Sequence, residues 1–209
     1  MIRATLWDFG GVLTTSPFEA FARFESQHGY PAGFIRGINS TDPDHNAWAR
    51  FERGEIGGAA FDQLFLLEST RAGQPLRGRD VLPLLAGDMR PEMVEALRRC
   101  HEKLKTACLT NNFRGPDPSA DPGRRRLESV REHFDVIVES SELGFRKPDP
   151  RFYQHALQRL GVEATECVFL DDLGVNLKSA RALGMQTIKV VSAQQALEEL
   201  EAVLGIPLR

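Results

Sequence analysis

Five short apolar segments, spread along the whole chain, constrain its fold more than any other feature. Each is bounded by polar or turn residues, and most are rich in β-branched or large apolar residues, as buried strands are. They span residues 4–7, 106–109, 136–138, 167–170 and 187–191. Helical patterns separate the last four, and this alternation is typical of a parallel sheet with helices on both faces. The sequence therefore predicts an α/β fold.

Proline and glycine mark the ends of the helices between these strands. One helical pattern begins at Pro91, a residue suited to the first turn of a helix. A second begins near Pro150 and stops at Gly161, and a third runs from about Gly174 and stops at Gly184. Glycine is the usual residue just beyond a helix C-terminus, so both stops are expected helix ends.

The segment from Thr15 to about Asp88 interrupts this alternation and shows no convincing strand. Residues 16–19 form a capping-box pattern with proline in the first turn, and further helices are expected at 48–51 and 59–70. Neighbouring parallel strands need only one crossover helix, so several helices favour a separate unit over helices packed on the sheet. We therefore predict a core domain of residues 1–14 and 89–209, with a small helical cap domain of residues 15–88 inserted after strand 1.

Charge and cysteine content narrow the class of protein. Lys and Arg number 26 against 29 Asp and Glu, a net charge of −3, which disfavours a protein that binds nucleic acid by neutralising phosphates. Three separated cysteines do not make a disulfide framework. No apolar run approaches the roughly 18 residues of a membrane span, and residues 1–8 lack a signal-peptide pattern. We expect a cytoplasmic protein, a monomer or homodimer, with no nucleic-acid or membrane partner.

Polar side chains follow the predicted strands at their carboxyl ends, where ligands bind in an open parallel sheet. Asp8 follows the first strand, residues 110–112 (Thr-Asn-Asn) follow the second, and Asp171 and Asp172 follow the fourth. Residues 146–147 (Arg-Lys) come after the third strand and a loop. A lone carboxylate at such a place is usually a cap or turn residue. Several charged groups converging from distant parts of the chain are harder to explain in that way.

The residue types at this edge indicate phosphoryl transfer. Crowded carboxylates raise each other's pKa, and a divalent cation removes that repulsion. Oxygen ligands favour a hard ion, with Mg²⁺ the usual choice where a phosphate is also bound. Lys147, Thr110 and Asn111 suit the charge of a phosphoryl group, and residues 10–11 (Gly-Gly) let the backbone approach a ligand closely. Asp8 is then the expected covalent nucleophile.

Four segments in order resemble the motifs of the haloacid dehalogenase-like (HAD) hydrolase superfamily. They are WDFGGVLT at residues 7–14, LTNN at 109–112, RKP at 146–148 and FLDD at 169–172. The block from Gly144 to Met185 is similar to the phosphatase domain of soluble epoxide hydrolase and its bacterial relatives. The resemblance covers the whole chain. It implies a Rossmann-like core, a helical cap after the first motif, a Mg²⁺ cofactor and a small phosphorylated substrate.

The resemblance also implies a role for each matched residue. Asp8 would become an aspartyl phosphate, Thr110 with Asn111 beside it would bind the phosphoryl group, and Lys147 would hold nucleophile and phosphate together. The implied Mg²⁺ ligands are Asp8, the backbone carbonyl of Gly10, Asp172 and, directly or through water, Asp171, with Asn176 orienting them.

Gly10 departs from the family pattern, which has a second Asp two residues after the nucleophile. That Asp protonates the leaving oxygen and later activates water, and such help is typically worth about 10²–10⁴-fold in rate. A water, the substrate or a cap residue could move the proton instead. Asp42, Asp44 and His45 are the candidates that the cap offers.

Three functions compete. The favoured one is a Mg²⁺-dependent phosphatase acting on a small phosphorylated metabolite. A 2-haloacid dehalogenase shares the nucleophile but needs no metal, so it leaves the adjacent Asp171 and Asp172 unexplained. A catalytically weak protein that binds a phosphorylated ligand is supported by Gly10. It is opposed by the presence of Asp8, Lys147 and Asp172, because a binding protein needs no nucleophile.

Several other residues have structural interpretations. Asn112 is expected to be structural, and Cys108 and Cys167 to be small core residues. The phenylalanines of the first cap helix are expected in the cap core, with lining of an apolar substrate pocket as the alternative: Phe18, Phe21 and Phe24. Residues 115–123 are predicted to form a loop, followed by a solvated helix face at 124–126.

Overall fold

The core of the protein is a parallel five-stranded sheet in the order β3-β2-β1-β4-β5. This computed structural model describes residues 1–113 and 122–208. The strands are β1 (Ala4–Trp7), β2 (Lys105–Thr110), β3 (Val136–Glu139), β4 (Cys167–Asp171) and β5 (Gln186–Lys189). The predicted fold class, a Rossmann-like α/β sheet flanked by helices, is confirmed.

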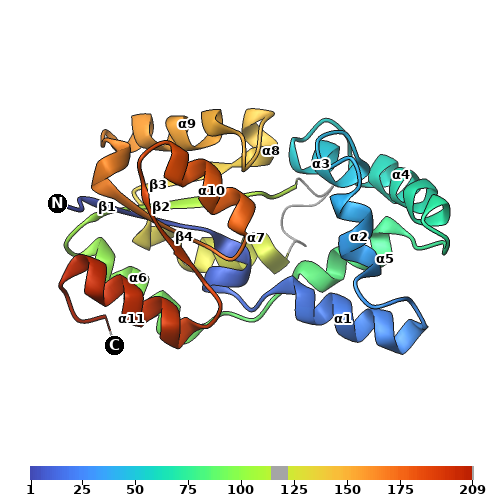
Figure 1. Ribbon diagram of the computed structural model, residues 1–209, viewed down its shortest axis with the longest axis horizontal. Coiled ribbons are helices and arrows are strands. Elements are labelled where there is room, and N and C mark those ends of the chain that lie inside the picture. The colour runs from blue at the N-terminus through green and yellow to red at the C-terminus, as the bar shows by residue number, and fades with distance from the viewer. Residues whose placement is uncertain (114–121, 209) are drawn as a thin grey trace.

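Helices cover both faces of the sheet (Figure 1). On one face lie α9 (Pro150–Leu160) and α10 (Gly174–Ala182), and on the other lie α6 (Pro91–His101) and α11 (Ala193–Leu204). Because side chains alternate along a strand, Leu6 of β1 packs toward α9 and α10, whereas Trp7 packs toward α6 and α11. The continuous apolar strands are therefore explained by burial on both sides.

Most predicted helix ends agree with the structure. Helix α6 begins at Pro91, and α9 ends before Gly161, whose φ of 64° is left-handed. The last predicted strand is too long at its end, because the Val191 N–H donates to Gln195 Oε1 instead of to the sheet. The same Gln195 side chain forms the capping box of α11 with Ser192, and the sequence patterns did not reveal this helix.

Shorter elements complete the core. They are η1 (Phe9–Leu13), α7 (Pro122–Ser129), η4 (Arg131–His133), α8 (Ser140–Leu143) and η5 (Ala164–Glu166). Of the predicted loop at 115–123, residues 115–121 lie outside the described residues, and 122–123 instead form the first turn of α7. Arg124 and Arg125 of the expected solvated helix face are exposed.

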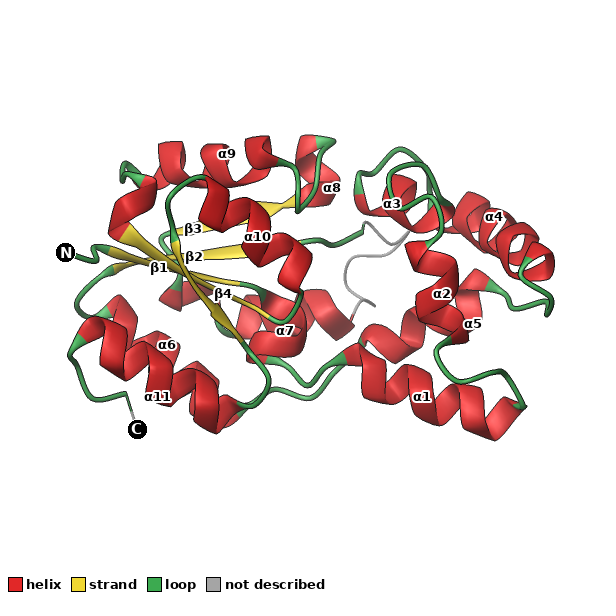
Figure 2. Ribbon diagram, in the orientation of Figure 1, coloured by secondary structure: helices red, strands yellow, loops and turns green. Residues whose placement is uncertain are grey.

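Residues 15–88, called the cap below, form a separate group of helices beyond the carboxyl ends of the strands (Figures 1 and 2). Its elements are α1 (Pro17–His28), α2 (Phe34–Ser40), α3 (Ala47–Glu52), α4 (Gly58–Arg71), α5 (Gly78–Val81) and η2 (Leu82–Leu85). An aromatic cluster around Phe21, Phe51, Phe61 and Phe65 is its core.

Helix α2 was not predicted, and its cap explains why. The residue before it, Gly33, has no side chain to cap the helix. Glu25 of α1 does so instead, accepting hydrogen bonds from the backbone N–H groups of Gly33 and Ile35 at 2.7 and 2.9 Å. A cap that comes from another helix leaves no local sequence signal.

Two backbone passages join the cap to the core. Thr14 pairs with Met89 in an antiparallel bridge, and the Thr15 N–H donates to Asp88 O at 2.8 Å. The predicted domain boundaries fall in these passages and stay a prediction. In the described part of the chain, no helix is long and apolar enough to cross a membrane.

Candidate functional site

A buried lysine lies between two carboxylates at the carboxyl edge of the sheet. Lys147 Nζ is 2.9 Å from Asp8 Oδ1 and 2.7 Å from Asp171 Oδ2. The Lys147 side chain is 1% exposed and that of Asp171 is fully buried, so water screens these charges little. The structure thus brings together residues from β1, β4 and the segment before α9, as the sequence predicted for this edge.

Three carboxylates, Asp8, Asp171 and Asp172, lie near a single lysine at this edge. Burial would lower the pKa of Lys147, but the charges of Asp171 and Asp8 outweigh that effect and raise it. Burial, together with the charges of Asp171 and Asp172, raises the pKa of Asp8 well above its usual range, although Lys147 opposes the shift. The pKa of Asp172 rises to about 6 for the same two reasons, burial first and the charge of Asp171 second. One lysine therefore does not offset the raised pKa of Asp8 and Asp172, and a second cation near them would lower both.

Asp171 has its oxygens largely engaged within the protein. Asn176 Nδ2 donates to Asp171 Oδ1 and Oδ2 at 3.1 and 3.0 Å, and the Leu173 N–H donates to Oδ1 at 2.8 Å. Lys147 Nζ also donates a hydrogen bond to Asp171 Oδ2. This arrangement suits a residue that holds Lys147 in place better than a direct metal ligand.

Asn111 holds the backbone that carries Lys147. Its Nδ2 donates to Lys147 O at 3.0 Å, and its Oδ1 accepts from the Lys147 N–H at 2.9 Å. Thr110, at the end of β2, is 7% exposed and lines the cavity above Asp8. Thr110 is thus the better placed of the two to meet a phosphoryl group with its side chain.

Asn112 makes only structural contacts among the described residues. Its backbone N–H donates to Ser140 Oγ at 3.0 Å, and its Oδ1 accepts from Ser141 Oγ at 2.9 Å. These bonds join the segment after β2 to the start of α8. They agree with the structural interpretation of this residue.

The two glycines after Asp8 have different local requirements. Gly10 has φ −69° and ψ 131°, which any residue adopts, and a Cβ there would meet nothing within 4 Å. Gly11 has φ +76°, and a Cβ there would stand 2.3 Å from Asp172 Oδ2. Only Gly11 is therefore needed for the turn that places the backbone against Asp172.

The donor set fits a magnesium ion. Carboxylate oxygens of Asp8, Asp171 and Asp172 all lie within 4.8 Å of one another. Hard oxygen ligands and uncompensated negative charge are what Mg²⁺ requires. Asp8 and Asp172, with the Gly10 carbonyl, would hold the ion, and Asp171 would stand behind them.

A cavity of about 1140 Å³ connects this edge to the cap. Asp8, Gly10, Thr110, Lys147 and Asp172 line its floor. The cap supplies mostly apolar and aromatic walls: Pro17, Phe18, Phe21, Trp48, Leu82 and Leu85. Both interpretations of the phenylalanines thus apply, since Phe21 belongs to the cap core and also lines the cavity.

Of the cap residues considered for proton transfer, only Asp44 lines this cavity among the described residues. Asp42 and His45 pair with each other at 2.9 Å on an exposed surface. They are therefore poor candidates for a step at Asp8.

A polar contact between cap and core was missed by the sequence analysis. Arg146, next to Lys147, donates to Glu52 Oε2 of α3 at 2.7 Å and to Pro43 O at 2.5 Å. Ser140 Oγ donates to the Glu52 carbonyl at 2.6 Å. Burial raises the pKa of Glu52, an effect that Arg146 partly offsets. An acid in an amphipathic cap helix carries no local signal of such a partner.

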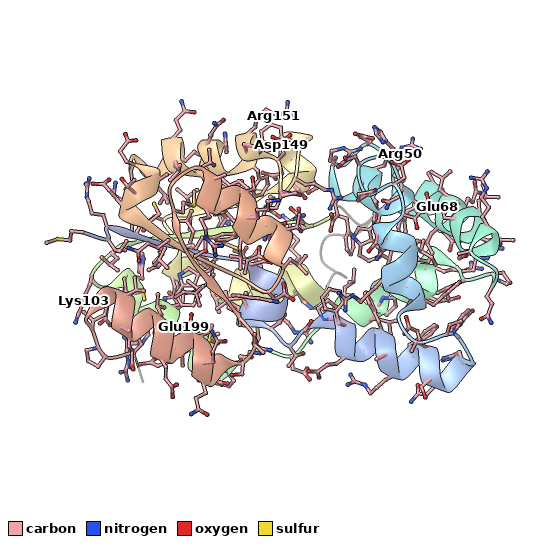
Figure 3. All side chains as sticks on the ribbon, in the orientation of Figure 1. Arg50, Glu68, Lys103, Asp149, Arg151 and Glu199 are labelled. Atoms are coloured by element: carbon pink, nitrogen blue, oxygen red, sulfur yellow. The ribbon has the colours of Figure 1, made fainter. Side chains whose placement is uncertain are left out.

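By contrast, other charged side chains point to the outside of the molecule (Figure 3). Asp149 and Arg151 form an exposed pair at the start of α9, and Lys103 and Glu199 lie on the outer surface of the core. Among the described residues, buried charge is thus found at the sheet edge, in the Glu52–Arg146 contact and at Glu25, which caps α2.

Comparison with known proteins gives three informative relatives. Acyl-CoA dehydrogenase family member 10 of Mus musculus is 41% identical over 99% of this chain and 19% of its own length. Bifunctional epoxide hydrolase 2 of Sus scrofa is 34% identical over 99% of the chain and 40% of its own length. The chain thus spans less than half of these two proteins. Sesquiterpene phosphatase astK of Aspergillus oryzae is 28% identical, with 97% of both chains covered.

Solved structures and a family model complete the comparison. An HAD family enzyme of Bacteroides thetaiotaomicron, in complex with magnesium and inorganic phosphate, matches with a TM-score of 0.65 and 21% identity over 96% of this chain and 99% of its own. L-2-haloacid dehalogenase of Xanthobacter autotrophicus matches with a TM-score of 0.61 and 18% identity, covering 99% and 84%. At these identities the likeness shows the fold. The model of haloacid dehalogenase-like hydrolases matches residues 2–184, and with the relatives above it shows that the chain belongs to this hydrolase family.

Proposed function

We propose that this hydrolase is a Mg²⁺-dependent phosphatase that forms an aspartyl phosphate on Asp8. The observation that carries the proposal is the Asp8–Lys147–Asp171 arrangement beside Asp172, at the floor of a cavity. A dehalogenase needs the nucleophile and no metal site, so it leaves the raised pKa of Asp172 and the carboxylate cluster without a purpose.

Asp8 is held for attack by its neighbours. Its Oδ1 accepts from the Phe9 N–H at 2.7 Å and faces Lys147 Nζ. Within the described residues Oδ2 has no donor, which leaves this oxygen to attack phosphorus. The new bond joins Oδ2 to phosphorus as the bond between phosphorus and the alcohol oxygen breaks. The leaving oxygen departs with the electron pair of that bond and takes a proton from a water molecule in the cavity.

A second step regenerates the enzyme. Water attacks the phosphorus of the aspartyl phosphate, the bond from phosphorus to Asp8 breaks, and inorganic phosphate leaves. Lys147 stays protonated throughout, because its two carboxylate neighbours raise its pKa. Bound Mg²⁺ would neutralise Asp8 and Asp172 and stabilise negative charge on the phosphoryl oxygens.

The cavity walls favour a substrate with an apolar organic group. The aromatic and aliphatic side chains of the cap face a volume much larger than a phosphate needs. One relative is named a sesquiterpene phosphatase, and a sesquiterpene is an apolar hydrocarbon. The name of that relative agrees with the preference proposed for this cavity. We therefore propose a monoester whose phosphate lies at the sheet edge and whose apolar part lies under the cap.

The proposal is tested by phosphate release from an aryl phosphate with a good leaving group. We expect hydrolysis with Mg²⁺, loss of activity with a chelator, and reduction of Asp8→Asn to background. Such a leaving group departs without protonation, so Gly10 in place of an acid does not prevent the reaction. Activity that survives both the chelator and Asp8→Asn would exclude this mechanism.

A halide-release assay with a short 2-haloacid runs in parallel. Metal-independent halide release that requires Asp8 would replace the phosphatase proposal with a dehalogenase. Absence of either activity over a broad panel of phosphate esters would instead favour a protein that only binds a phosphorylated ligand.

A further inference from the structure

The residue before Lys147 joins the core to the cap. Arg146 Nη1 donates to Glu52 Oε2 of α3 at 2.7 Å, and its Nη2 donates to Pro43 O at 2.5 Å. The side chains of Arg146 and Glu52 are 18% and 12% exposed, so solvent screens this ion pair little. Because both acceptors belong to the cap, a movement of the cap away from the sheet breaks the contacts of the residue next to Lys147.

Glu52 is also held at this interface from the cap side. Its other carboxylate oxygen, Oε1, accepts from Trp48 Nε1 at 3.0 Å. The Trp48 ring in turn packs edge-on against Phe61 of the cap core, with 5.7 Å between the ring centroids. Each carboxylate oxygen of Glu52 therefore has its own donor, one from the cap and one from the core, and the two bonds together fix its orientation.

A second chain of hydrogen bonds runs from Glu52 to the backbone of Lys147. Ser140 Oγ, at the start of α8, donates to the Glu52 carbonyl at 2.6 Å and accepts from the Asn112 N–H at 3.0 Å. The neighbouring Asn111 pairs with the backbone N–H and carbonyl of Lys147. Glu52 is thus connected to Lys147 along two routes, one from its carboxylate and one from its carbonyl.

These contacts lie on the side of the cavity away from the chain connections. Figure 1 shows α3 next to α8 at one side, whereas the two passages that join cap and core run to α1 at the other side. The cavity between them is lined by Pro17 of α1 as well as by Glu52 of α3. A cap joined to the core on one side can pivot about that side, and the Glu52 contacts fasten the opposite side.

We propose that Glu52 is a positioning residue for the reaction, which holds Lys147 in place against Asp8 only while the cap is closed over the sheet edge. The inference rests on the proposed phosphatase function for the role of Lys147 beside the nucleophile. Asp171 anchors Lys147 Nζ, but the backbone that carries the lysine is tied to Glu52 along the two routes described above. Closing the cap would thereby complete the charge arrangement around Asp8.

Steady-state kinetics with an aryl phosphate and Mg²⁺ separate positioning from mere closure of the cap. Glu52→Gln keeps the size of the side chain but offers one acceptor oxygen instead of two, so Arg146 or Trp48 loses its partner. We expect kcat to fall by about 10–100-fold with little change in KM, the effect of displacing a group by about 1 Å. An unchanged kcat, with or without a rise in KM, would show that the pair only shapes the cavity and would overturn the inference.

Further variants test the two routes. Arg146→Met removes both bonds to the cap but keeps the aliphatic stem, and combining it with Glu52→Gln should lower kcat no further than the worse single variant does. Arg146→Lys should recover part of kcat, because an ammonium still faces Glu52. Ser140→Ala breaks the second route and should lower kcat in the same way but less. Losses of Glu52→Gln and Arg146→Met that multiply in the double variant would contradict a shared route.

The matched control is Glu55→Gln. Glu55 is an exposed acid just beyond α3, where it pairs with Arg53, and it is not among the described residues that line the cavity. This variant removes the same charge from the same part of the cap, so it should retain the wild-type kcat and KM. A loss of kcat equal to that of Glu52→Gln would mean that the charge of the cap, and not its contact with Arg146, is what matters.

Hydrogen exchange of single backbone amides tests the inference without turnover. The Lys147 N–H donates to Asn111 Oδ1, whereas the Leu173 N–H donates to Asp171 Oδ1 within the core. In Glu52→Gln we expect the Lys147 N–H to exchange at least about tenfold faster, as for the loss of one charged hydrogen bond, and the Leu173 N–H to exchange as in the wild type.

The exchange result also separates this inference from the phosphatase proposal. Faster exchange confined to the Lys147 N–H supports the inference even if the wild type hydrolyses no phosphate ester. Equal acceleration at Leu173 would indicate general destabilisation, and unchanged exchange at Lys147 would show that Glu52 does not hold this backbone. Either result would overturn the inference, while Mg²⁺-dependent hydrolysis that requires Asp8 would leave the phosphatase proposal standing.

Discussion

The sheet edge and the cap wall face the same cavity but are stabilised in opposite ways. At the edge, the buried Lys147 Nζ lies 2.9 Å from Asp8 and 2.7 Å from Asp171, and the side chains of Asn111 and Asn176 hold this group by hydrogen bonds. On the cap side, aromatic rings stack on one another, with Phe51 and Phe61 at 4.7 Å between centroids. Charge requires fixed partners, whereas apolar surface requires only burial.

This difference indicates which region tolerates change. A buried charge that loses its partner has a large free-energy cost, so substitutions at the edge should be severe and local. Apolar contacts are less directional, so the cap can vary its side chains and thereby its substrate while it keeps its own core. Chemistry would then be fixed at the edge and specificity set by the cap.

The largest effect is expected from removing the central cation. In Lys147→Met, two buried carboxylates lose their partner, which should cost about 3–5 kcal/mol in the free energy of unfolding. Activity should fall by at least 10²–10³-fold, roughly the effect of losing one charge-stabilising donor. Urea unfolding and phosphate release measure both. Lys103→Met, at an exposed lysine on the core surface, is the control and should change neither.

Substitutions of the two glycines after Asp8 should have very different effects on stability. Gly11→Ala places a Cβ against Asp172 and forces an unfavourable φ, so we expect about 1–3 kcal/mol of destabilisation and weaker Mg²⁺ binding. Gly10→Ala has open space and an ordinary φ, so it should fold like the parent. Thermal unfolding with and without Mg²⁺ compares them. Equal effects at both positions would contradict the close approach to Asp172.

The polar contact between cap and core should matter less than the edge. Glu52→Gln removes the charge that balances Arg146, and we expect a loss of about 1–3 kcal/mol because the pair is largely buried. Glu55→Gln removes an exposed acid, 45% accessible, from its pair with Arg53 in the same part of the cap and should cost less than ~1 kcal/mol. Similar losses in both variants would show that burial of the Glu52–Arg146 pair adds nothing.

The smallest effect is a pH dependence. Asp172 has a pKa of about 6 in the folded protein, against 3.8 as its ordinary value, so the folded state binds more protons between these values. The free energy of unfolding without metal should therefore fall as the pH rises from about 4 to about 6, by ~1–2 kcal/mol. Asp172→Asn should flatten this slope, while Mg²⁺ binding to the parent should strengthen over the same range. A slope of the opposite sign would contradict the raised pKa.

Sequence patterns predicted the sheet, and which polar residues lie at its carboxyl edge, because both depend on local signals. Buried parallel strands are continuous apolar runs, and the residue after each run lies at the ligand-binding edge, so Asp8, Thr110 and Asp171 could be assigned to one place. Helices α2, α5, α8 and α11 were not predicted, and the end of β5 was placed too late. Their limits depend on contacts between elements, such as Glu25 capping α2.

By itself, the sequence determined the fold class, the alternation of strands and helices in the core, and which polar residues lie at the sheet edge. Only the tertiary structure decided that Asn111 holds the Lys147 backbone and that Asp171 is occupied by Lys147 and Asn176. The reason is physical. Hydrophobic periodicity is a local property of the sequence, whereas the partner of a charged or hydrogen-bonding group often comes from residues far away along the chain.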